Sequence, residues 1–153
     1  MPNAIQDLIP GNHCYGCGPD NELGLQIKSY WDGHESHCDY TPRPEQCAGP
    51  TQFVYGGTIA SLIDCHCVCT AIAHQYEKEG RAIGEGEAIW CVTGQLTVNY
   101  LAPTPIDKPV HLTAKIEESG ARKTILKCTV TSGDTVTAEG QVIAIRVPPS
   151  WRN

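Results

Sequence analysis

The chain has 153 residues, 41% hydrophobic and 18% charged, and its 11 basic and 17 acidic residues give a net charge of -6 at pH 7. This length fits one hydrophobic core, so we expect a single domain over residues 1–153 with an irregular N-terminal segment over about 1–23. The longest basic run is Arg122-Lys123, which argues against nucleic acid as the main partner, because binding phosphates requires a basic face.

The N-terminal stretch lacks the basic segment and apolar run of an export signal, and no run of 18 apolar residues occurs along the chain. We therefore expect a cytoplasmic protein with no membrane partner. The nine cysteines are an odd number, which does not suit a complete disulfide framework. Cys65, Cys67 and Cys69 lie within one apolar segment and are interpreted as small, reduced core residues.

The first regular elements are predicted within residues 23–42, as two short strands around a turn at Asp32-Gly33, because Asp-Gly between half-apolar runs favours a tight hairpin. A loop rich in proline and glycine follows. A long helix is then predicted from Gly56 to about Lys78, with Gly80 as its C-terminal stop. Its first four turns are apolar on nearly every side, so we expect this helix to be enclosed.

The remainder of the chain reads as β-branched strands joined by short loops, over residues 88–103, 110–119, 122–132 and 135–147. Two strands, a long helix and four more strands favour an α+β fold in which an antiparallel sheet curls around one central helix. Such a sheet covers a helix only partly and leaves open edges, so a homodimer is expected.

Two features of the predicted helix point to chemistry. Gly56 and Gly57 stand where it begins, so its first backbone N–H groups are free and a ligand carbonyl can approach them closely, as in an oxyanion hole. Asp64 is an acid within an apolar run and has no cationic neighbour one turn away. The alternatives are that the glycines only allow close packing and that the acid is held by structural hydrogen bonds.

Eight helical residues separate Gly56 from Asp64 by about 12 Å, which is too far for both to act on one carbonyl. If both take part in catalysis, they must come from different chains. A two-fold dimer with antiparallel central helices would bring Asp64 of one subunit towards Gly56 of the other.

Three motifs together resemble a known family. The segment YGGTIASLID resembles the His-Gly-Gly, six residues, Asp or Glu signature of hotdog-fold acyl-CoA thioesterases of the phenylacetate-pathway type, within the 4-hydroxybenzoyl-CoA thioesterase superfamily. The segments CYGCGPDNELGL and TGQLTVNYLAPTP also resemble segments of many members, so the similarity covers nearly the whole chain. The resemblance implies a hotdog fold, a homodimer that can pair into a dimer of dimers, and hydrolysis of acyl-CoA thioesters without a cofactor or metal.

The resemblance also implies roles for individual residues. Asp64 matches the general base or nucleophile, Gly56 the glycine whose N–H polarises the thioester carbonyl, and Thr93 a Ser or Thr that positions the attacking water. Tyr55 replaces the family histidine and would contribute a hydrogen bond and part of the pocket rim, next to Gly57. Arg122 and Lys123 fall at a turn where members carry basic residues for the nucleotide; a solvated hairpin tip is the alternative.

Two other functions remain open. The Tyr55 replacement makes a non-catalytic module that binds acyl-CoA or an acyl carrier credible. The pair Cys14-x-x-Cys17 has the spacing of half a zinc site or of a redox pair, with His13, Cys38 or Cys47 as conceivable further ligands. Structural packing of the loop is the favoured interpretation of this pair. His66 lies about 200° around the helix from Asp64, so it is interpreted as a packed or interface histidine.

Overall fold

The computed structural model describes residues 2–152, so the two end residues of the predicted domain lie outside the described part. Over this range the chain forms a six-stranded sheet in the order β1-β2-β4-β5-β6-β3, with antiparallel neighbours throughout. The strands are β1 (Tyr30–Trp31), β2 (Glu35–Tyr40), β3 (Cys91–Tyr100), β4 (Val110–Ser119), β5 (Lys123–Ser132) and β6 (Thr135–Arg146). The predicted antiparallel α+β arrangement is confirmed.

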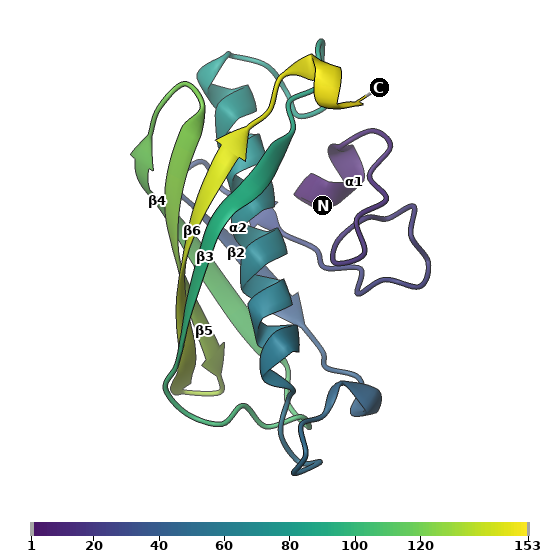
Figure 1. The fold of residues 1–153 in the computed structure, drawn as a ribbon, viewed down its shortest axis with the longest axis vertical. Helices are drawn as coiled ribbons and strands as arrows, with labels where there is room; N and C mark the ends of the chain where they lie inside the picture. Colours follow the sequence, from purple (N-terminus) through teal and green to yellow (C-terminus); the bar gives the residue numbers. More distant parts are fainter. Residues whose placement is uncertain (1, 153) are drawn as a thin grey trace.

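The long helix α2 (Gly56–Lys78) lies along one face of the sheet, as Figure 1 shows. Its bounds agree with the prediction, and Gly80 adopts the left-handed conformation (φ 69°) that ends it. The helix approaches β6 closely at Gly140, where an added Cβ would come within 2.7 Å of Ile63 Cγ2. By length and composition α2 could cross a membrane, but most of it is buried in this fold, as in the core helix of a water-soluble protein.

The N-terminal segment, residues 2–29, runs beside α2 on the side away from the sheet (Figure 1). It is largely irregular, as predicted, except for the short helix α1 (Ile5–Leu8), which was not predicted. Gln6 joins the beginning of this segment to its end, because the Gln6 side-chain oxygen accepts a hydrogen bond from the Ser29 backbone N–H at 2.8 Å. Ile9 and Ile27 of this segment are buried in the core.

The expectation that α2 is enclosed is only partly met within one chain. A stripe along its outward face stays half-exposed, because the N-terminal segment covers only part of that face. The stripe repeats at i and i+4 and consists mostly of small residues: Gly56, Gly57, Ala60, Ser61, Asp64, Cys65 and Val68. It lies beside β3, which is an edge strand whose outer backbone groups have no neighbour in the described sheet.

Candidate active site

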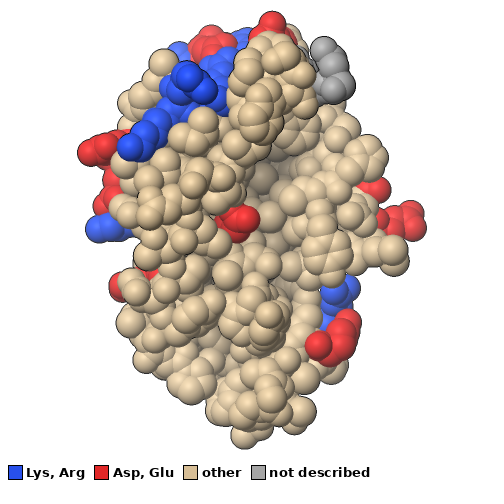
Figure 2. All heavy atoms as spheres, in the orientation of Figure 1, with Lys and Arg blue, Asp and Glu red and all other residues tan. Residues whose placement is uncertain are grey.

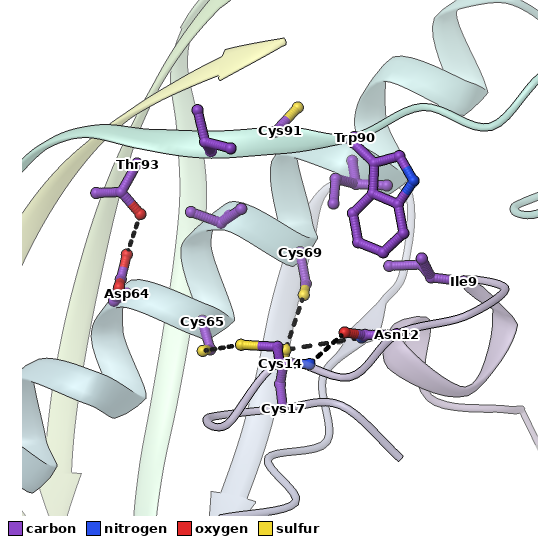
Figure 3. Close-up of a pocket in the computed structure, with 13 residues that line it drawn as sticks. Ile9, Asn12, Cys14, Cys17, Asp64, Cys65, Cys69, Trp90, Cys91 and Thr93 are labelled. Carbon is purple, nitrogen blue, oxygen red and sulfur yellow. Dashed lines mark hydrogen bonds between the residues drawn. The ribbon is translucent and has the colours of Figure 1, made fainter. Parts of the chain in front are cut away.

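Asp64 and Thr93, two residues proposed for the site from sequence, are in contact. The Thr93 hydroxyl donates a hydrogen bond of 2.5 Å to the Asp64 carboxylate, as Figure 3 shows. Asp64 comes from the third turn of α2 and is half-buried, and Thr93 comes from the edge strand β3. The acid in the apolar helix thus has a hydroxyl partner on the neighbouring strand and access to solvent.

A bulge in β3 sets the direction of the Thr93 side chain. The pairing register between β3 and β6 shifts between Thr93 and Gln95, so that Gly94 is the extra residue. An added Cβ on Gly94 would come within 2.9 Å of Ile145 Cγ1. A larger residue at this position would therefore displace the Ile145 side chain. Bulges re-aim side chains, and here the result is that the Thr93 hydroxyl faces α2.

A cavity of about 300 Å³ opens beside this pair. Its walls come from three parts of the chain, namely the N-terminal segment, α2 and the start of β3, and its lining includes Ile9, Asp64, Val68, Ile72, Trp90 and Thr93. Figure 2 shows that the corresponding face is hollowed and mostly uncharged, with an acidic group near its middle. An apolar cavity with a carboxylate at its edge suits a ligand with an apolar part and one reactive polar group.

The start of α2 forms a second, separate region. Gly56 lines another cavity, of about 410 Å³, together with Phe53 and Tyr100. The Tyr100 hydroxyl donates to the Gly56 carbonyl at 2.6 Å, and burial raises the pKa of Tyr100, with a smaller contribution from Tyr55, which keeps the hydroxyl protonated. The N-cap residue Tyr55 makes no side-chain capping hydrogen bond to the first turn of α2.

The two glycines differ in what an added side chain would meet. An added Cβ on Gly57 would lie 2.4 Å from the ring of Tyr55, so a side chain there would require the exposed Tyr55 ring to move. An added Cβ on Gly56 would lie 3.5 Å from Tyr100, an ordinary contact. Contacts within the chain therefore do not prevent a small side chain at Gly56, so packing alone does not account for the glycine.

The structure does not bring Gly56 and Asp64 together within one chain, because the two residues line different cavities. This agrees with their separation of about 12 Å along the helix. Arg122 and Lys123 lie in neither region but at the hairpin between β4 and β5. This hairpin lies near the C-terminal end of α2, because the Gly120 carbonyl accepts a hydrogen bond from Lys78 Nζ at 3.2 Å. Basic side chains gather at this end of the molecule in Figure 2.

The structure gives the three cysteines of α2 different surroundings. Cys67 and Cys69 are buried in the core, as expected, whereas Cys65 is only partly buried, and Cys65 and Cys69 both contact the N-terminal segment. Their sulfur atoms lie 3.8 Å from that of Cys14 and 3.7 Å from that of Cys17, respectively. Hydrogen bonds from Cys14 and then from Cys65 and Cys69 lower the pKa of Cys17. The i, i+4 spacing of Cys65 and Cys69 was the available sequence signal.

His66 is a packed histidine, as interpreted from the sequence. It is fully buried, with Nδ1 at 2.7 Å from the Ser29 hydroxyl and Nε2 at 3.1 Å from the Ser36 hydroxyl. Burial lowers its pKa to about 4. His66 therefore links α2 to the N-terminal segment and β2 as a neutral side chain, away from Asp64.

Comparison with known proteins decides the family. The model of the thioesterase superfamily matches residues 51–139, more than half of the chain. The chain belongs to the thioesterase superfamily. The match begins just before α2 and includes Asp64 and Thr93, whereas the N-terminal segment with Cys14 and Cys17 lies outside it.

Individual members of the thioesterase superfamily agree with this assignment. The chain is 30% identical over 100 residues to acyl-coenzyme A thioesterase THEM4 of Xenopus laevis, covering 63% of this chain and 37% of that protein. It is 31% identical over 103 residues to THEM4 of Mus musculus, covering 66% and 39%. The chain thus spans less than two-fifths of the length of these relatives.

Two solved structures share the fold of this chain. A thioesterase superfamily protein from Shewanella loihica PV-4 is 33% identical, with a TM-score of 0.68 over 90% of this chain and 96% of that one. The PaaI protein of the E. coli phenylacetic acid degradation operon is 17% identical, with a TM-score of 0.64 over 81% of each chain. The fold is therefore the α+β hotdog fold that the sequence motifs implied.

Proposed function

We propose that this protein hydrolyses acyl-CoA thioesters to a free acid and CoA. The observation that carries the proposal is the Asp64 carboxylate, held by the Thr93 hydroxyl at the edge of an apolar cavity. Membership of the thioesterase superfamily and the similarity to acyl-CoA thioesterase THEM4 support this reaction and substrate class.

The chemistry requires a carboxylate, an ordered nucleophile and a polarised carbonyl. Asp64 acts as the general base that takes a proton from water, or as the nucleophile that attacks the thioester carbon itself. The Thr93 hydroxyl orients the carboxylate and the attacking water. The acyl group occupies the cavity between the N-terminal segment, α2 and β3, where apolar walls exclude bulk water.

The polarised carbonyl is proposed to bind the Gly56 N–H of a second subunit. Three observations support a two-fold dimer: the separation of Gly56 and Asp64 within one chain, the open edge of β3, and the half-exposed stripe of small residues along α2. Antiparallel α2 helices packed through this stripe would set the Asp64 cavity of one subunit against the Gly56 region of the other. Pairing of two such dimers into a tetramer is compatible with this arrangement.

The first experiment measures thioester cleavage with a panel of acyl-CoAs of different chain length and aromaticity. Product CoA should be followed by chromatography, because the nine cysteines of the chain react with thiol reagents. Asp64→Asn should lower kcat by roughly 10²- to 10⁴-fold. The matched control is Asp134→Asn, an exposed acid at the turn between β5 and β6, which should behave as wild type. Full turnover by Asp64→Asn would exclude the mechanism.

The second experiment tests the shared site by mixing subunits. Gly56→Ala should fold, since its Cβ makes only an ordinary contact with Tyr100, but the methyl group should block a carbonyl from the N–H. Asp64→Asn and Gly56→Ala homodimers should both be nearly inactive. A heterodimer of the two contains one intact site of two if the residues act across the interface, so activity should reappear. No recovery in purified heterodimers would place both residues in one subunit's site.

A second candidate function is acyl-CoA or acyl-carrier binding without turnover. It is favoured by Tyr55, which stands where the family signature has histidine and is 58% exposed at the start of α2. Calorimetric binding of a non-hydrolysable acyl-CoA thioether, together with no cleavage of any thioester in the panel, would support binding alone. Restored or increased cleavage in Tyr55→His would show that this position limits the reaction.

A further inference from the structure

Four cysteine side chains from two distant parts of the chain converge in the lining of the cavity (Figure 3). The sulfur atoms of Cys14, Cys17 and Cys65 all lie within 4.8 Å of one another. Cys14 lies 3.8 Å from Cys65, and Cys69 adds a fourth sulfur that is 3.7 Å from that of Cys17 but lies outside the set of three within 4.8 Å, so its side chain must turn towards them to complete a site. This convergence is more than the packing of small core residues, because Cys14 is exposed and Cys65 is half-exposed.

The sulfur–sulfur spacing fits the ligands of one metal ion. A disulfide requires about 2.05 Å, so the four side chains are thiols or thiolates rather than two bridges. Tetrahedral thiolates at about 2.3 Å from one zinc ion are about 3.8 Å apart, which matches the Cys14–Cys65 and Cys17–Cys69 separations. In a [2Fe–2S] cluster two cysteines bind each iron, and sulfurs on different irons lie farther apart than the 4.8 Å within which the sulfurs of Cys14, Cys17 and Cys65 all lie.

The backbone around Cys14 and Cys17 is shaped to direct both sulfurs to one point. The Gly18 N–H donates to the Cys14 carbonyl at 2.7 Å, which closes a tight turn around the pair. Added Cβ atoms at Gly16 and Gly18 would each collide at 2.3 Å, the first with Cys65 Sγ and the second with the Cys14 backbone nitrogen. Both glycines are therefore required by the approach of this turn to itself and to α2.

The surroundings also suit a charged sulfur group. Asn12 is buried, its amide donates to Cys17 Sγ at 3.8 Å, and its side-chain oxygen accepts from the Cys14 N–H at 3.2 Å. Such amide donors stabilise thiolate ligands from outside the coordination sphere and fix their direction. Cys65 and Cys69 stand one turn apart on the same face of α2, so both can reach one ion.

We propose that Cys14, Cys17, Cys65 and Cys69 bind one Zn²⁺ ion in a structural site. Binding displaces the thiol protons to solvent, and four protein ligands leave no open position for a substrate. The ion clamps the N-terminal segment onto α2 and thereby holds one wall of the acyl cavity in place. Cys38 and Cys47, considered as ligands from the sequence, are not required.

Metal analysis of protein purified under reducing conditions without chelator tests the proposal. About one zinc per chain is expected, with cobalt substitution giving the intense visible bands of a tetrahedral thiolate site. Cys14→Ser and Cys65→Ser should each lose the metal or bind it far more weakly. Cys67→Ala is the matched control, because it removes a cysteine from the opposite face of the same helix, and it should retain one zinc.

Four results would overturn the proposal. The first is wild-type protein that binds no zinc when Zn²⁺ is added under reducing conditions. The second is a Cys14→Ser, Cys65→Ser double variant that keeps its zinc. The third is iron in place of zinc, and the fourth is a mass that shows two disulfides. If the serine variants do not fold, chelation of the wild type decides: hydrogen exchange should rise in residues 9–29 and stay low in β4, β5 and β6, and unchanged exchange would contradict the clamp.

Discussion

The two faces of α2 have different compositions and different tasks. The face towards the sheet carries Leu62, Ile63 and Cys67, all fully buried. The opposite face carries Asp64, Cys65 and small residues, and it remains half-exposed. The first face holds the fold together, and the second presents the carboxylate, the thiols and the surface for a second subunit. One helix can therefore be apolar on almost every side although only one side is core.

Replacement of a side chain on the sheet-facing side should give the largest loss of stability. Leu62→Ala removes a fully buried side chain and should lower the free energy of unfolding by about 2–5 kcal/mol. Val68→Ala, on the half-exposed face, should cost less than about 1 kcal/mol. Urea unfolding followed by circular dichroism measures both. Equal losses would contradict the division of the helix into two faces.

The buried histidine on α2 predicts a pH dependence of stability. Burial lowers the pKa of His66 to about 4, whereas an unfolded chain binds the proton near pH 6.5. The unfolded state thus gains a proton first as the pH falls, so stability should be full above pH 6.5 and decline towards pH 4, by up to roughly 3 kcal/mol.

Urea midpoints of the wild type and His66→Gln between pH 7.5 and pH 4.5 would measure the contribution of His66. The glutamine side chain retains hydrogen-bonding capacity towards Ser29 and Ser36 but cannot titrate in this range. The variant should show a flatter pH dependence, and identical slopes would show that His66 is not the responsible group.

Replacement of Thr93, the hydroxyl partner of Asp64 on β3, should have a smaller effect, which is confined to kcat. Thr93→Val keeps the shape of the side chain but loses the hydrogen bond, so kcat should fall about tenfold. Thr93→Ser keeps the hydroxyl and should restore most of kcat, which a purely structural role of the threonine would not predict. Steady-state kinetics with one acyl-CoA measures the three proteins side by side.

The smallest effect is expected far from the outward face of α2, at the hairpin between β4 and β5. If Arg122 and Lys123 contact the nucleotide of CoA, the double alanine variant should raise KM a few-fold at low salt and leave kcat unchanged, since exposed charges contribute about 0.2–1 kcal/mol each. Lys108→Ala, an exposed lysine elsewhere, is the control. An unchanged KM would assign the pair to a solvated hairpin tip.

Much of the fold could be predicted because its signals are local. The period of apolar residues and Gly80 defined α2, and the glycine turns at Gly33 and Gly133 separated strands correctly. The short helix α1 lacks a side-chain cap and has only four residues, so it has no such signal. The position of β3 at the sheet edge results from long-range pairing with β6, which no local pattern specifies.

The candidate site also contains residues that could be predicted from the sequence and residues that could not. Asp64 was selected as an acid within an apolar run and by resemblance to a family, Thr93 by the resemblance alone, and the structure places the two in contact. The thiol cluster was missed because it joins Cys14 and Cys65, 51 residues apart, and because an apolar helix hides the i, i+4 pair among other small residues. Neither composition nor periodicity distinguishes a cysteine that faces the core from one that faces another loop.

The hydrogen bond between Tyr100 and the Gly56 carbonyl couples two parts of the site. That carbonyl and the Gly57 N–H belong to one peptide group, so a donor on its oxygen polarises the N–H at the start of α2 and fixes its plane. Tyr100 is the last residue of β3, the strand with the open edge. A partner that pairs with this edge and shifts the strand would therefore also rotate the peptide group that directly follows the proposed Gly56 N–H donor.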